Sequence, residues 1–244
     1  MISETAAPLT SAQRNLVEQV SVAARSLSDG GHDDFNQGQV SARQPGSDIF
    51  FIKNATTGFD ECTPSDILVA SVDPHAEKHP QLPPEVVLHQ AVYAARPDVN
   101  AIVHSHAPYT LVFGATDLPL RAVSHDGAFF QGRTPRFTMT SNTILTLDVA
   151  TAVASAIDDS PAAFLRNHGG VIVGKSIRHA TVYAHMLERA CQLQLMAEAV
   201  SGGYHSSEDE DIDAKREFNF ADLSVRSYWE HLARRVKARQ LTLN

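Results

Sequence analysis

Histidines stand at two places where an apolar segment of the sequence gives way to a loop. Val103-His104-Ser105-His106 follows an apolar run and precedes a proline, which predicts a short buried strand that ends there. Side chains repeat every two residues along a strand, so His104 and His106 point to the same side. His168 again stands at the predicted end of a strand, and the two glycines after it allow a close backbone approach.

Three neutral histidines with an open coordination position suit Zn²⁺, Mn²⁺ or Fe²⁺ acting as a Lewis acid. Such an ion binds a hydroxyl or keto oxygen and stabilises an enolate formed at that oxygen. Retro-aldol cleavage and the decarboxylation of β-keto-type acids both require an enolate. For the H-x-H motif taken alone, a pair of histidines bonded to water or backbone is the alternative interpretation.

Glu85 is the candidate acid or base of this site. It follows Pro83-Pro84, where a helix is predicted to begin, and His89 lies four residues further along the same helix face. The carboxylate can exchange a proton with the substrate, or serve as a fourth metal ligand in the resting state. A glutamate in a first turn is also stabilised by the helix dipole without any catalytic role.

The overall composition predicts an ordered protein of one large domain or two small ones. The 244 residues are 43% hydrophobic and 20% charged. A net charge of −8, with a basic segment only at 234–239, disfavours nucleic acid as a partner. We expect no membrane span and no secretion signal, because the sequence contains neither kind of apolar run. The distant Cys62 and Cys191 form no metal or redox motif, which favours a cytoplasmic location.

Hydrophobic periodicity and turn residues predict alternating helices and strands around these segments. The first ten residues are predicted to be a loose tail, 124–127 a site loop or a turn, and the acidic run 206–213 a solvated linker. Helices are predicted from a cap at Thr10 or Ser11 to Gly30-Gly31 and over 85–96, 109–115, 147–157, 176–200 and 215–238, and strands over 40–43, 49–53, 67–72 and 99–106, with two more within 162–173.

Three stretches of the sequence together resemble the class II aldolase/adducin family. They are Glu85-x-x-x-His89, the segment 93–106 and Asn167-His168-Gly169, and the resemblance runs from about Leu16 to about Ala197. It implies an α/β fold of the α+β type, with a central, mostly antiparallel nine-stranded sheet flanked by helices on both sides. It also implies a homotetramer with fourfold symmetry and active sites at the subunit boundaries.

We expect a single domain over residues 1–244, with 205–244 as a C-terminal helical extension. The resemblance assigns roles to the residues that match the family motifs. It implies a divalent metal ion as cofactor, with His104, His106 and His168 as its ligands, Glu85 as the acid or base, and His89 supporting the ligands from behind.

The sequence departs from the sugar-phosphate aldolases of this family at their phosphate-binding motifs. Gly38-Gln39-Val40-Ser41 stands where those enzymes carry Gly-Asn-x-Ser, and Pro83-Pro84 replaces two serines before the glutamate. Prolines supply neither hydroxyl nor N–H donors, so a phosphate group would lose most of its cradle. Thr57-Gly58 could still mark part of that pocket as substrate-binding residues. All three histidines are present, which disfavours the metal-free role of adducin-like chains.

Further segments resemble members of the family that decarboxylate hydroxylated aromatic or pyridine dicarboxylic acids and carboxylated ring-cleavage products. Lys53 replaces the small residues of the phosphate-binding forms, and a fixed cation there would bind a substrate carboxylate. A surface lysine at a strand end is the alternative for Lys53. The similar segments are Lys53, 58–61, 120–126, Lys215-Arg216-Glu217 and Tyr228-Trp229.

The sequence therefore predicts a metal-dependent, non-oxidative decarboxylase of a small-molecule carboxylate. CO₂ leaves, and Glu85 or a nearby group such as His125 delivers the proton to carbon. Three alternatives stay open: an aldolase for a non-phosphorylated hydroxy-keto compound, an Fe(II) oxygenase of the same fold, and a non-catalytic interaction module.

Overall fold

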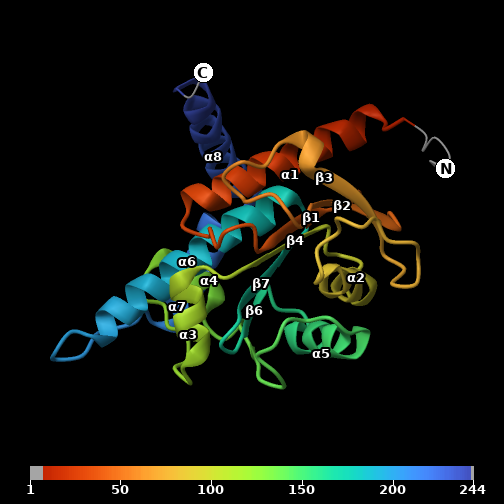
Figure 1. The fold of residues 1–244 in the computed structure, drawn as a ribbon. Coiled ribbons are helices and arrows are strands. Elements are labelled where there is room, and N and C mark those ends of the chain that lie inside the picture. The colour runs from red at the N-terminus through yellow and green to blue at the C-terminus, as the bar shows by residue number, and fades with distance from the viewer. Residues whose placement is uncertain (1–7, 243–244) are drawn as a thin grey trace.

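A computed structural model of the chain describes residues 8–242, so most of the predicted N-terminal tail lies outside the described residues. Within this range a seven-stranded sheet forms the centre, in the order β3-β2-β1-β4-β7-β6-β5 (Figure 1). Every neighbouring pair is antiparallel except β5 and β6. The strands are β1 (Gln39–Ala42), β2 (Ile49–Lys53), β3 (Ile67–Ser71), β4 (Ala101–Ser105), β5 (Arg136–Phe137), β6 (Ala162–Leu165) and β7 (Gly169–Gly174).

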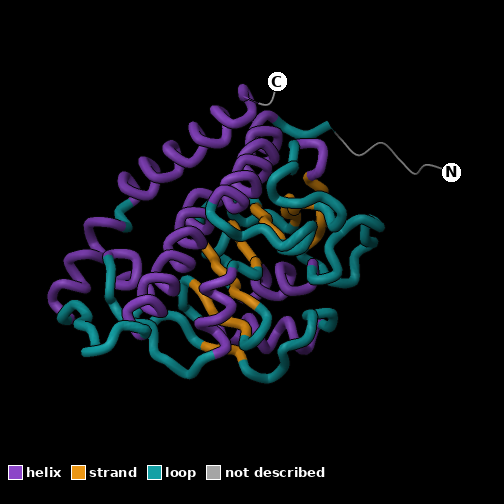
Figure 2. Tube along the Cα trace, turned by 60° about the vertical axis from the view of Figure 1, so that its left-hand side comes forward, coloured by secondary structure: helices purple, strands orange, loops and turns teal. Residues whose placement is uncertain are grey.

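Helices cover both faces of this sheet, so the strands lie in the interior (Figure 2). On one face α2 (Val86–Ala95) packs beside α5 (Leu147–Ile157). The other face is covered by α1 (Ser11–Asp29), α3 (Pro108–Ala115) and α6 (Ile177–Glu198). The remaining helices are α4 (His125–Phe130), α7 (Asp209–Asn219) and α8 (Asp222–Thr242), and Pro64–Asp66 forms one 3₁₀ turn.

Because both faces of the sheet are buried, the sequences of its strands are nearly continuous runs of apolar residues. Phe50 faces the α2–α5 layer and Phe51 faces the opposite layer. Ile102 and Val103 of β4 divide in the same way. By this alternation His104 shares the face of Ile102, which is the face that carries α2. The α/β fold class and the mostly antiparallel sheet are confirmed, although seven strands are described where nine were expected.

Three local predictions differ from the structure. The acidic segment predicted as a linker contains the start of α7, because acidic groups in a first turn are favoured by the helix dipole. The single helix predicted over 215–238 is two helices that break at Phe220. Residues 124–127 start α4, where Ser124 Oγ accepts a hydrogen bond from the Gly127 N–H at 3.1 Å. The division at residue 205 stays a prediction.

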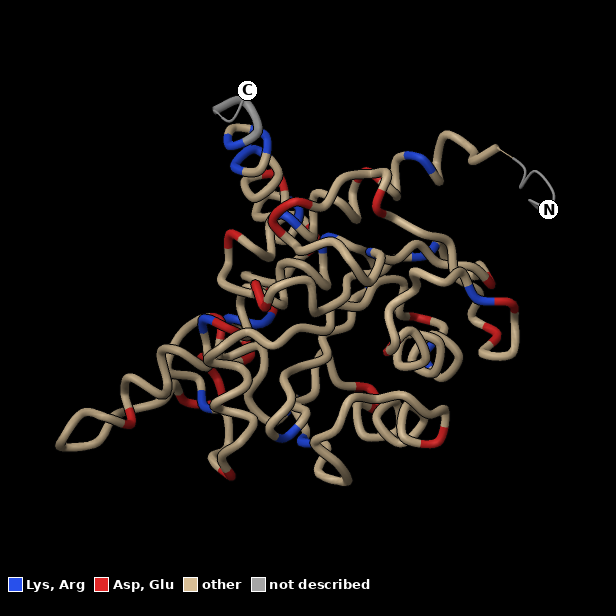
Figure 3. Tube along the Cα trace, in the orientation of Figure 1, with Lys and Arg blue, Asp and Glu red and all other residues tan. Residues whose placement is uncertain are grey.

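No helix within residues 8–242 is long and apolar enough to cross a membrane. Charged residues of both signs are spread along the chain (Figure 3). Basic residues gather near the C-terminal end of α8, which agrees with the basic segment noted at 234–239.

Glu188 of α6 anchors the start of α3, the helix that follows the H-x-H segment. Its buried carboxylate accepts hydrogen bonds from the Tyr109 N–H at 2.9 Å and from the Thr110 N–H and Oγ1 at 2.7 Å each. First-turn N–H groups have no partner inside their own helix. We expect Glu188→Ala to lower the free energy of unfolding by about 3 kcal/mol, measured by urea denaturation. The exposed Glu18→Ala is the control, and an equal loss in both variants would contradict this role.

Candidate metal centre

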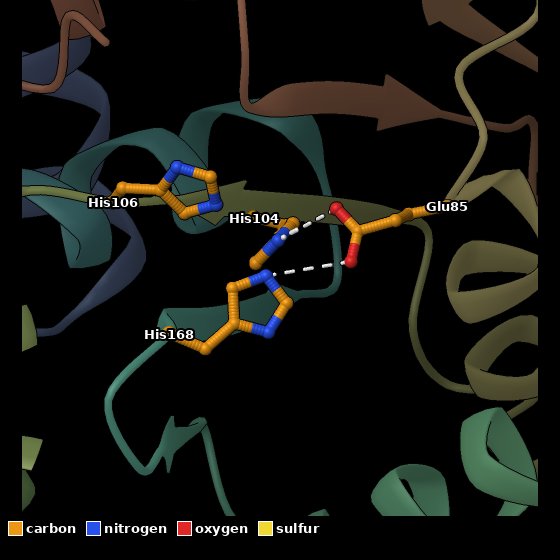
Figure 4. Close-up of side chains that lie close together, drawn as sticks. All are labelled: Glu85, His104, His106 and His168. Atoms are coloured by element: carbon orange, nitrogen blue, oxygen red, sulfur yellow. Dashed lines mark ion pairs between the residues drawn. The ribbon is translucent and has the colours of Figure 1, made fainter. Parts of the chain in front are cut away.

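Glu85, His104, His106 and His168 converge at one end of the sheet (Figure 4). One ligand atom from each side chain lies within 4.8 Å of the corresponding atom of every other. The imidazole ring centroids are 5.2 Å apart for His104 and His106, 5.0 Å for His104 and His168, and 5.2 Å for His106 and His168. The group of four could therefore hold one metal ion.

The pairing of β4 with β7 brings the two histidine segments together. Ser105 lies opposite Gly170 in the ladder, so His168 at the turn before β7 meets the end of β4. Gly169 has a φ of +151°, and a Cβ atom there would collide with the Ser105 carbonyl oxygen. The close backbone approach predicted from the two glycines is confirmed at this position.

Glu85 enters the group from the N-cap position directly before α2. Its Oε1 accepts a hydrogen bond from the Ile144 N–H at 2.9 Å. Oε2 lies 3.2 Å from His104 Nε2, and Oε1 lies 3.4 Å from His168 Nε2. The carboxylate thus faces the histidines and is held from outside the group by a backbone donor.

The hydrogen bonds of the ring nitrogens prepare two histidines as ligands. His104 Nδ1 donates to the Gly170 carbonyl oxygen at 3.0 Å, and His106 Nδ1 donates to Asp34 Oδ2 at 2.7 Å. The Nε2 atoms of both rings are buried, and neither makes a hydrogen bond of good geometry within the described residues, although His104 Nε2 faces Glu85 Oε2 at 3.2 Å. A neutral imidazole that donates through Nδ1 keeps its lone pair on Nε2, which is the arrangement found in metal-ligating histidines. These residues therefore fit a divalent ion.

Burial and mutual charge set the protonation of the group. Burial raises the pKa of Glu85, but the nearby His104 and the Ile144 N–H outweigh it and hold that pKa well below its usual range. Burial lowers the pKa of His104, but the Glu85 carboxylate outweighs it and raises the value. Burial and the charge of His104 lower the pKa of His106 and bring the pKa of His168 to about 4. His106 and His168 are thus neutral at pH 7, as metal binding requires.

His89 lies one turn after Glu85 and is fully buried behind the group. Its Nδ1 is 2.7 Å from Ser41 Oγ, which is in turn 2.8 Å from the Tyr93 hydroxyl. Its ring stacks on Phe50, with the centroids 6.3 Å apart. His89 makes no hydrogen bond to Glu85 or to the three clustered histidines, so any support it gives comes through packing and charge.

A cavity of about 230 Å³ opens beside Glu85 and His106. Its wall is rich in side-chain amides and contains both prolines that precede Glu85. One cation, Lys53, is among its lining residues. The lining residues are Asn36, Gln37, Gly38, Gln39, Lys53, Ala55, Pro83, Pro84, Glu85, His106 and Thr143.

Lys53 is fully buried, in contrast to the surface lysine considered as the alternative. Its Nζ donates to the backbone carbonyl oxygens of Asn36 at 3.1 Å, Asn54 at 2.9 Å and Thr57 at 2.6 Å. Burial lowers the pKa of Lys53 to about 8. The ammonium group therefore fixes the loop after β2 and carries its charge into the cavity wall.

Three other predicted site residues lie outside the lining of this cavity. Thr57 Oγ1 donates to Asp66 Oδ1 at 3.0 Å, and the Gly58 N–H donates to Glu61 Oε1 at 3.0 Å. His125 is exposed at the start of α4 and has no hydrogen bond or ion pair to the four clustered residues within this chain. The roles of Thr57, Gly58 and His125 stay predictions.

Several residues that position the site were not identified from the sequence. Asp34 orients His106, the Ile144 N–H holds Glu85, and Gln39 lies opposite His104 in the β1–β4 ladder. Asp34 stands in a turn-rich stretch, where a carboxylate is a usual turn residue, so only the fold shows its contact. Gln39 was noticed only as a departure from a family motif.

Two more histidines, the buried His32 and the partly buried His185, lie behind the strand that carries the ligands. His32 Nδ1 is 2.8 Å from Ser105 Oγ, and His185 Nε2 is 2.9 Å from Ser26 Oγ. Burial lowers the pKa of His32 to about 3 and that of His185 to about 4. Both rings are thus neutral in the folded protein near pH 5, whereas an unfolded histidine takes up a proton below about pH 6.5.

This difference in histidine pKa between the folded and the unfolded protein predicts that the folded state loses stability in acid. As the pH falls from 7 to 5, only the unfolded state gains these protons, so each ring should lower the free energy of unfolding by about 2 kcal/mol. We expect His185→Gln to reduce the loss measured by urea denaturation at the two pH values. The exposed His205→Gln should leave the loss unchanged. An identical pH dependence in wild type and His185→Gln would disprove the role of His185.

Comparison with known proteins places the chain in a family. The model of the class II aldolase and adducin N-terminal domain matches residues 18–195. A 4-hydroxy-3-prenylphenylpyruvate oxygenase/4-hydroxy-3-prenylbenzoate synthase of Streptomyces roseochromogenus is 27% identical over 159 residues, or 64% of this chain and 57% of that protein. Decarboxylase NovR of Streptomyces niveus is 26% identical over 156 residues, or 63% and 58%. The match thus spans less than two thirds of both relatives.

A solved structure shares the whole architecture. The aldolase II superfamily protein from Pseudomonas syringae superposes with a TM-score of 0.84 at 25% identity, over 95% of each chain. The matched family segment contains α2, β4 and β7, and with them all four clustered residues. This chain belongs to the class II aldolase and adducin family.

Proposed function

We propose that this protein is a divalent-metal-dependent carbon–carbon lyase that removes CO₂ from a hydroxy-aromatic dicarboxylate or a carboxylated ring-cleavage product without an oxidant. The observation that carries this proposal is the group of three histidines and Glu85, whose ligand atoms lie within 4.8 Å of one another beside a small cavity that two prolines help to line. The relative named as decarboxylase NovR supports the choice of reaction.

His104, His106 and His168 would hold the ion, which we expect to be Zn²⁺, Mn²⁺ or Fe²⁺. When bound, such an ion supplies a Lewis acid that stabilises negative charge on a substrate oxygen. Glu85 lines the cavity, and the Ile144 N–H fixes its orientation. Glu85 is ionised, so it can take a proton from a hydroxyl group of the substrate and return it to carbon after CO₂ has left. His125 would deliver the proton to carbon only if it came from a neighbouring subunit.

The cavity wall favours a carboxylate or hydroxyl group over a phosphate group. Asn36, Gln37 and Gln39 offer side-chain amides, whereas Pro83 and Pro84 offer no N–H donor. The charge of Lys53 lies in the same wall. We therefore propose that the amides bind the substrate carboxylate and that the charge of Lys53, whose three N–H groups already donate to backbone carbonyls, attracts it. Thr57 and Gly58 would act on it indirectly, through the loop that Lys53 holds.

Removal of the Lys53 charge should weaken binding of a carboxylate substrate. We expect Lys53→Met to raise KM about tenfold, because the only cation lining the described cavity is lost. Steady-state kinetics with a substrate and with its neutral amide analogue measure this effect. The exposed Lys78→Met is the control. An equal change for both compounds would show that Lys53 acts only through the loop.

Product analysis tests the reaction itself. The metal-loaded protein should release CO₂ from at least one member of a panel of hydroxyphthalate-type acids, and lose this activity after treatment with a chelator. No release from a broad panel would contradict a decarboxylase. Formation of an aldehyde from a non-phosphorylated hydroxy-keto compound would instead identify an aldolase that uses the same residues.

An oxygen-dependent reaction is the second candidate, because the Streptomyces roseochromogenus relative is named as an oxygenase. With Fe²⁺ bound, such an enzyme would consume O₂ as the substrate loses its carboxylate. An oxygen electrode distinguishes the two reactions, since non-oxidative decarboxylation proceeds under argon at the same rate. Activity that stops without O₂ would favour the oxygenase.

We also propose that four copies assemble in the cytoplasm with active sites completed by neighbouring subunits. Large apolar side chains are exposed close in sequence to residues of the site. Met139 and Leu145 flank Thr143 of the cavity wall and are 68% and 60% exposed, and Val112 on α3 is 49% exposed. Sedimentation equilibrium should give about four times the chain mass of 26.5 kDa. A monomer with full activity would contradict this assembly.

A further inference from the structure

One turn of the chain connects the metal centre to the wall of the cavity beside it. Asp34 Oδ2 accepts a hydrogen bond from the candidate ligand His106, and Asn36 and Gln37 line the cavity. The Gln37 N–H donates to the Asp34 carbonyl oxygen at 2.9 Å, which closes a four-residue turn, the 34–37 turn. A single residue, Phe35, therefore separates the carboxylate that orients a metal ligand from the amides of the cavity wall.

Phe35 has an unfavourable backbone conformation in this turn. Its φ is +52°, in the left-handed region that favours glycine. Within residues 8–242 the other non-glycine residues with positive φ are Asp158 and Asn167, whose short polar side chains tolerate this region. Phe35 is 88% exposed, so packing of its ring cannot compensate for the strain. The contacts of the neighbouring residues must therefore impose this conformation.

The two halves of the turn are held in different ways. Asn36 is bonded to the loop after β2, because its carbonyl oxygen accepts from Lys53 Nζ at 3.1 Å and its Nδ2 donates to the Ala55 carbonyl oxygen at 3.1 Å. The Asp34 side chain is 33% exposed, and the hydrogen bond from His106 Nδ1 at 2.7 Å is the only one that its carboxylate makes within the described residues. The contact that holds Asp34 thus has a candidate metal ligand as its donor.

Binding of a divalent ion to His106 Nε2, which is buried, would strengthen this contact. A cation on one ring nitrogen makes the N–H of the other nitrogen a stronger donor to a carboxylate. Carboxylate partners of ligating histidines change metal affinity by about 10–100-fold. By linkage, whatever stabilises the 34–37 turn must in return strengthen metal binding by the same factor.

We propose that the 34–37 turn couples the metal centre to the cavity wall, with Asp34 as a positioning residue for both. A bound ion holds Asp34 against the strain at Phe35, and the turn then keeps the Asn36 and Gln37 amides in the wall. The metal dependence of the turn stands apart from the lyase reaction, whereas the role of the amides in binding a carboxylate rests on the proposed function.

Metal affinity tests the coupling without any substrate. When the full-length protein competes with a chromophoric chelator for Zn²⁺, Asp34→Asn should bind the ion about 10–100-fold more weakly, because an amide is a neutral acceptor. Phe35→Gly should bind Zn²⁺ about threefold or more tightly, since glycine adopts a positive φ without strain. This gain should vanish when Asp34→Asn is also present. An unchanged affinity in either single variant would overturn the proposal.

Two matched controls separate this coupling from general effects of charge and strain. Asp33→Asn removes the neighbouring carboxylate, which accepts a hydrogen bond from Ser28 Oγ at 2.7 Å and not from a candidate ligand. Asp158→Gly relieves a positive φ of +47° at the end of α5. Neither control should change the affinity for Zn²⁺. A change as large as that in Asp34→Asn or Phe35→Gly would overturn the coupling, because a loss of charge or strain elsewhere would then suffice.

Hydrogen exchange of the Gln37 N–H, which closes the turn, reports the coupling directly. In wild type this amide should exchange at least about tenfold more slowly with Zn²⁺ bound than after treatment with a chelator. The Thr57 N–H donates to Asn54 Oδ1 at 2.9 Å on the loop that Lys53 holds, so it is the internal control and should change little. Equal exchange of Gln37 in both states would overturn the proposal.

Phthalate, a dicarboxylate without the reactive hydroxyl group, is the probe for the cavity wall. In calorimetric titrations of protein saturated with Zn²⁺, Asp34→Asn should bind phthalate several-fold more weakly than wild type and Asp33→Asn should not. Equal affinity in wild type and Asp34→Asn would overturn the link to the wall. A protein that shows the metal and phthalate effects but releases no CO₂ from any acid would contradict the lyase and support the coupling.

Discussion

Replacement of two clustered histidines, His104→Ala/His106→Ala, should remove both metal and activity. The variant keeps only His168 and Glu85 of the four residues whose ligand atoms lie within 4.8 Å of one another. We expect bound metal, measured by elemental analysis after gel filtration, to fall below one tenth of the wild-type content. The rate of CO₂ release should fall at least about 10³-fold, since metal stabilisation of charge supplies several kcal/mol.

The matched control replaces two histidines that are exposed, His75→Ala/His205→Ala. It removes the same side chains without touching the sheet, so metal content and rate should stay at the wild-type level. Retention of both the metal and full activity in His104→Ala/His106→Ala would contradict the metal centre. Loss of metal with an unchanged rate would separate the ion from the reaction and favour a structural role for it.

The predicted ligands lie close together in the structure because the residues next to them in the sequence fix the local backbone conformation. Val103-His104-Ser105-His106 obeys the two-residue repeat of a strand, so two rings had to share a side. The glycines after His168 permit a backbone contact that any Cβ would block. Glu85 stands at a helix start marked by Pro83-Pro84. These local rules marked the residues as candidates, and the resemblance to the family assigned their roles.

The residues that hold the site in place make contacts with partners far away in the sequence, and short-range sequence patterns cannot predict such contacts. Asp34 precedes His106 by 72 residues and Ile144 follows Glu85 by 59 residues, so no spacing connects them. Lys53 occupies a strand end that suits a surface lysine, yet three carbonyl oxygens hold its ammonium group inside the protein. Each of these pairings exists only after the sheet order has brought distant segments together.

Helices and strands whose sequence shows no clear hydrophobic periodicity were also not predicted. β5 contains only Arg136 and Phe137, too few residues for an alternation to appear. The acidic start of α7 has the composition of a solvated loop, and its helix is stabilised by the dipole and by the contact of Ile212 with Ala122 and Ala128. The helix is thus a consequence of tertiary packing, and composition alone favoured the wrong interpretation.

Glu85→Gln should separate proton transfer from metal binding. Glutamine has nearly the same shape, and its side-chain oxygen can still accept the Ile144 hydrogen bond, so the fold should be retained. It cannot take up and return a proton at neutral pH, and general acid–base catalysis typically contributes about 10²–10⁴-fold. We expect kcat to fall by that factor while the three histidines retain most of the metal.

Two measurements decide between the roles of Glu85. Metal content distinguishes a proton carrier from an essential ligand, since a ligand role predicts loss of metal together with rate. Product formed in deuterated water reports the proton delivered to carbon, and a proton carrier predicts that this step becomes rate-limiting in Glu85→Gln. The exposed Glu77→Gln is the matched control and should change neither quantity. A wild-type rate in Glu85→Gln would show that another group, such as His125 of a neighbouring subunit, handles the proton.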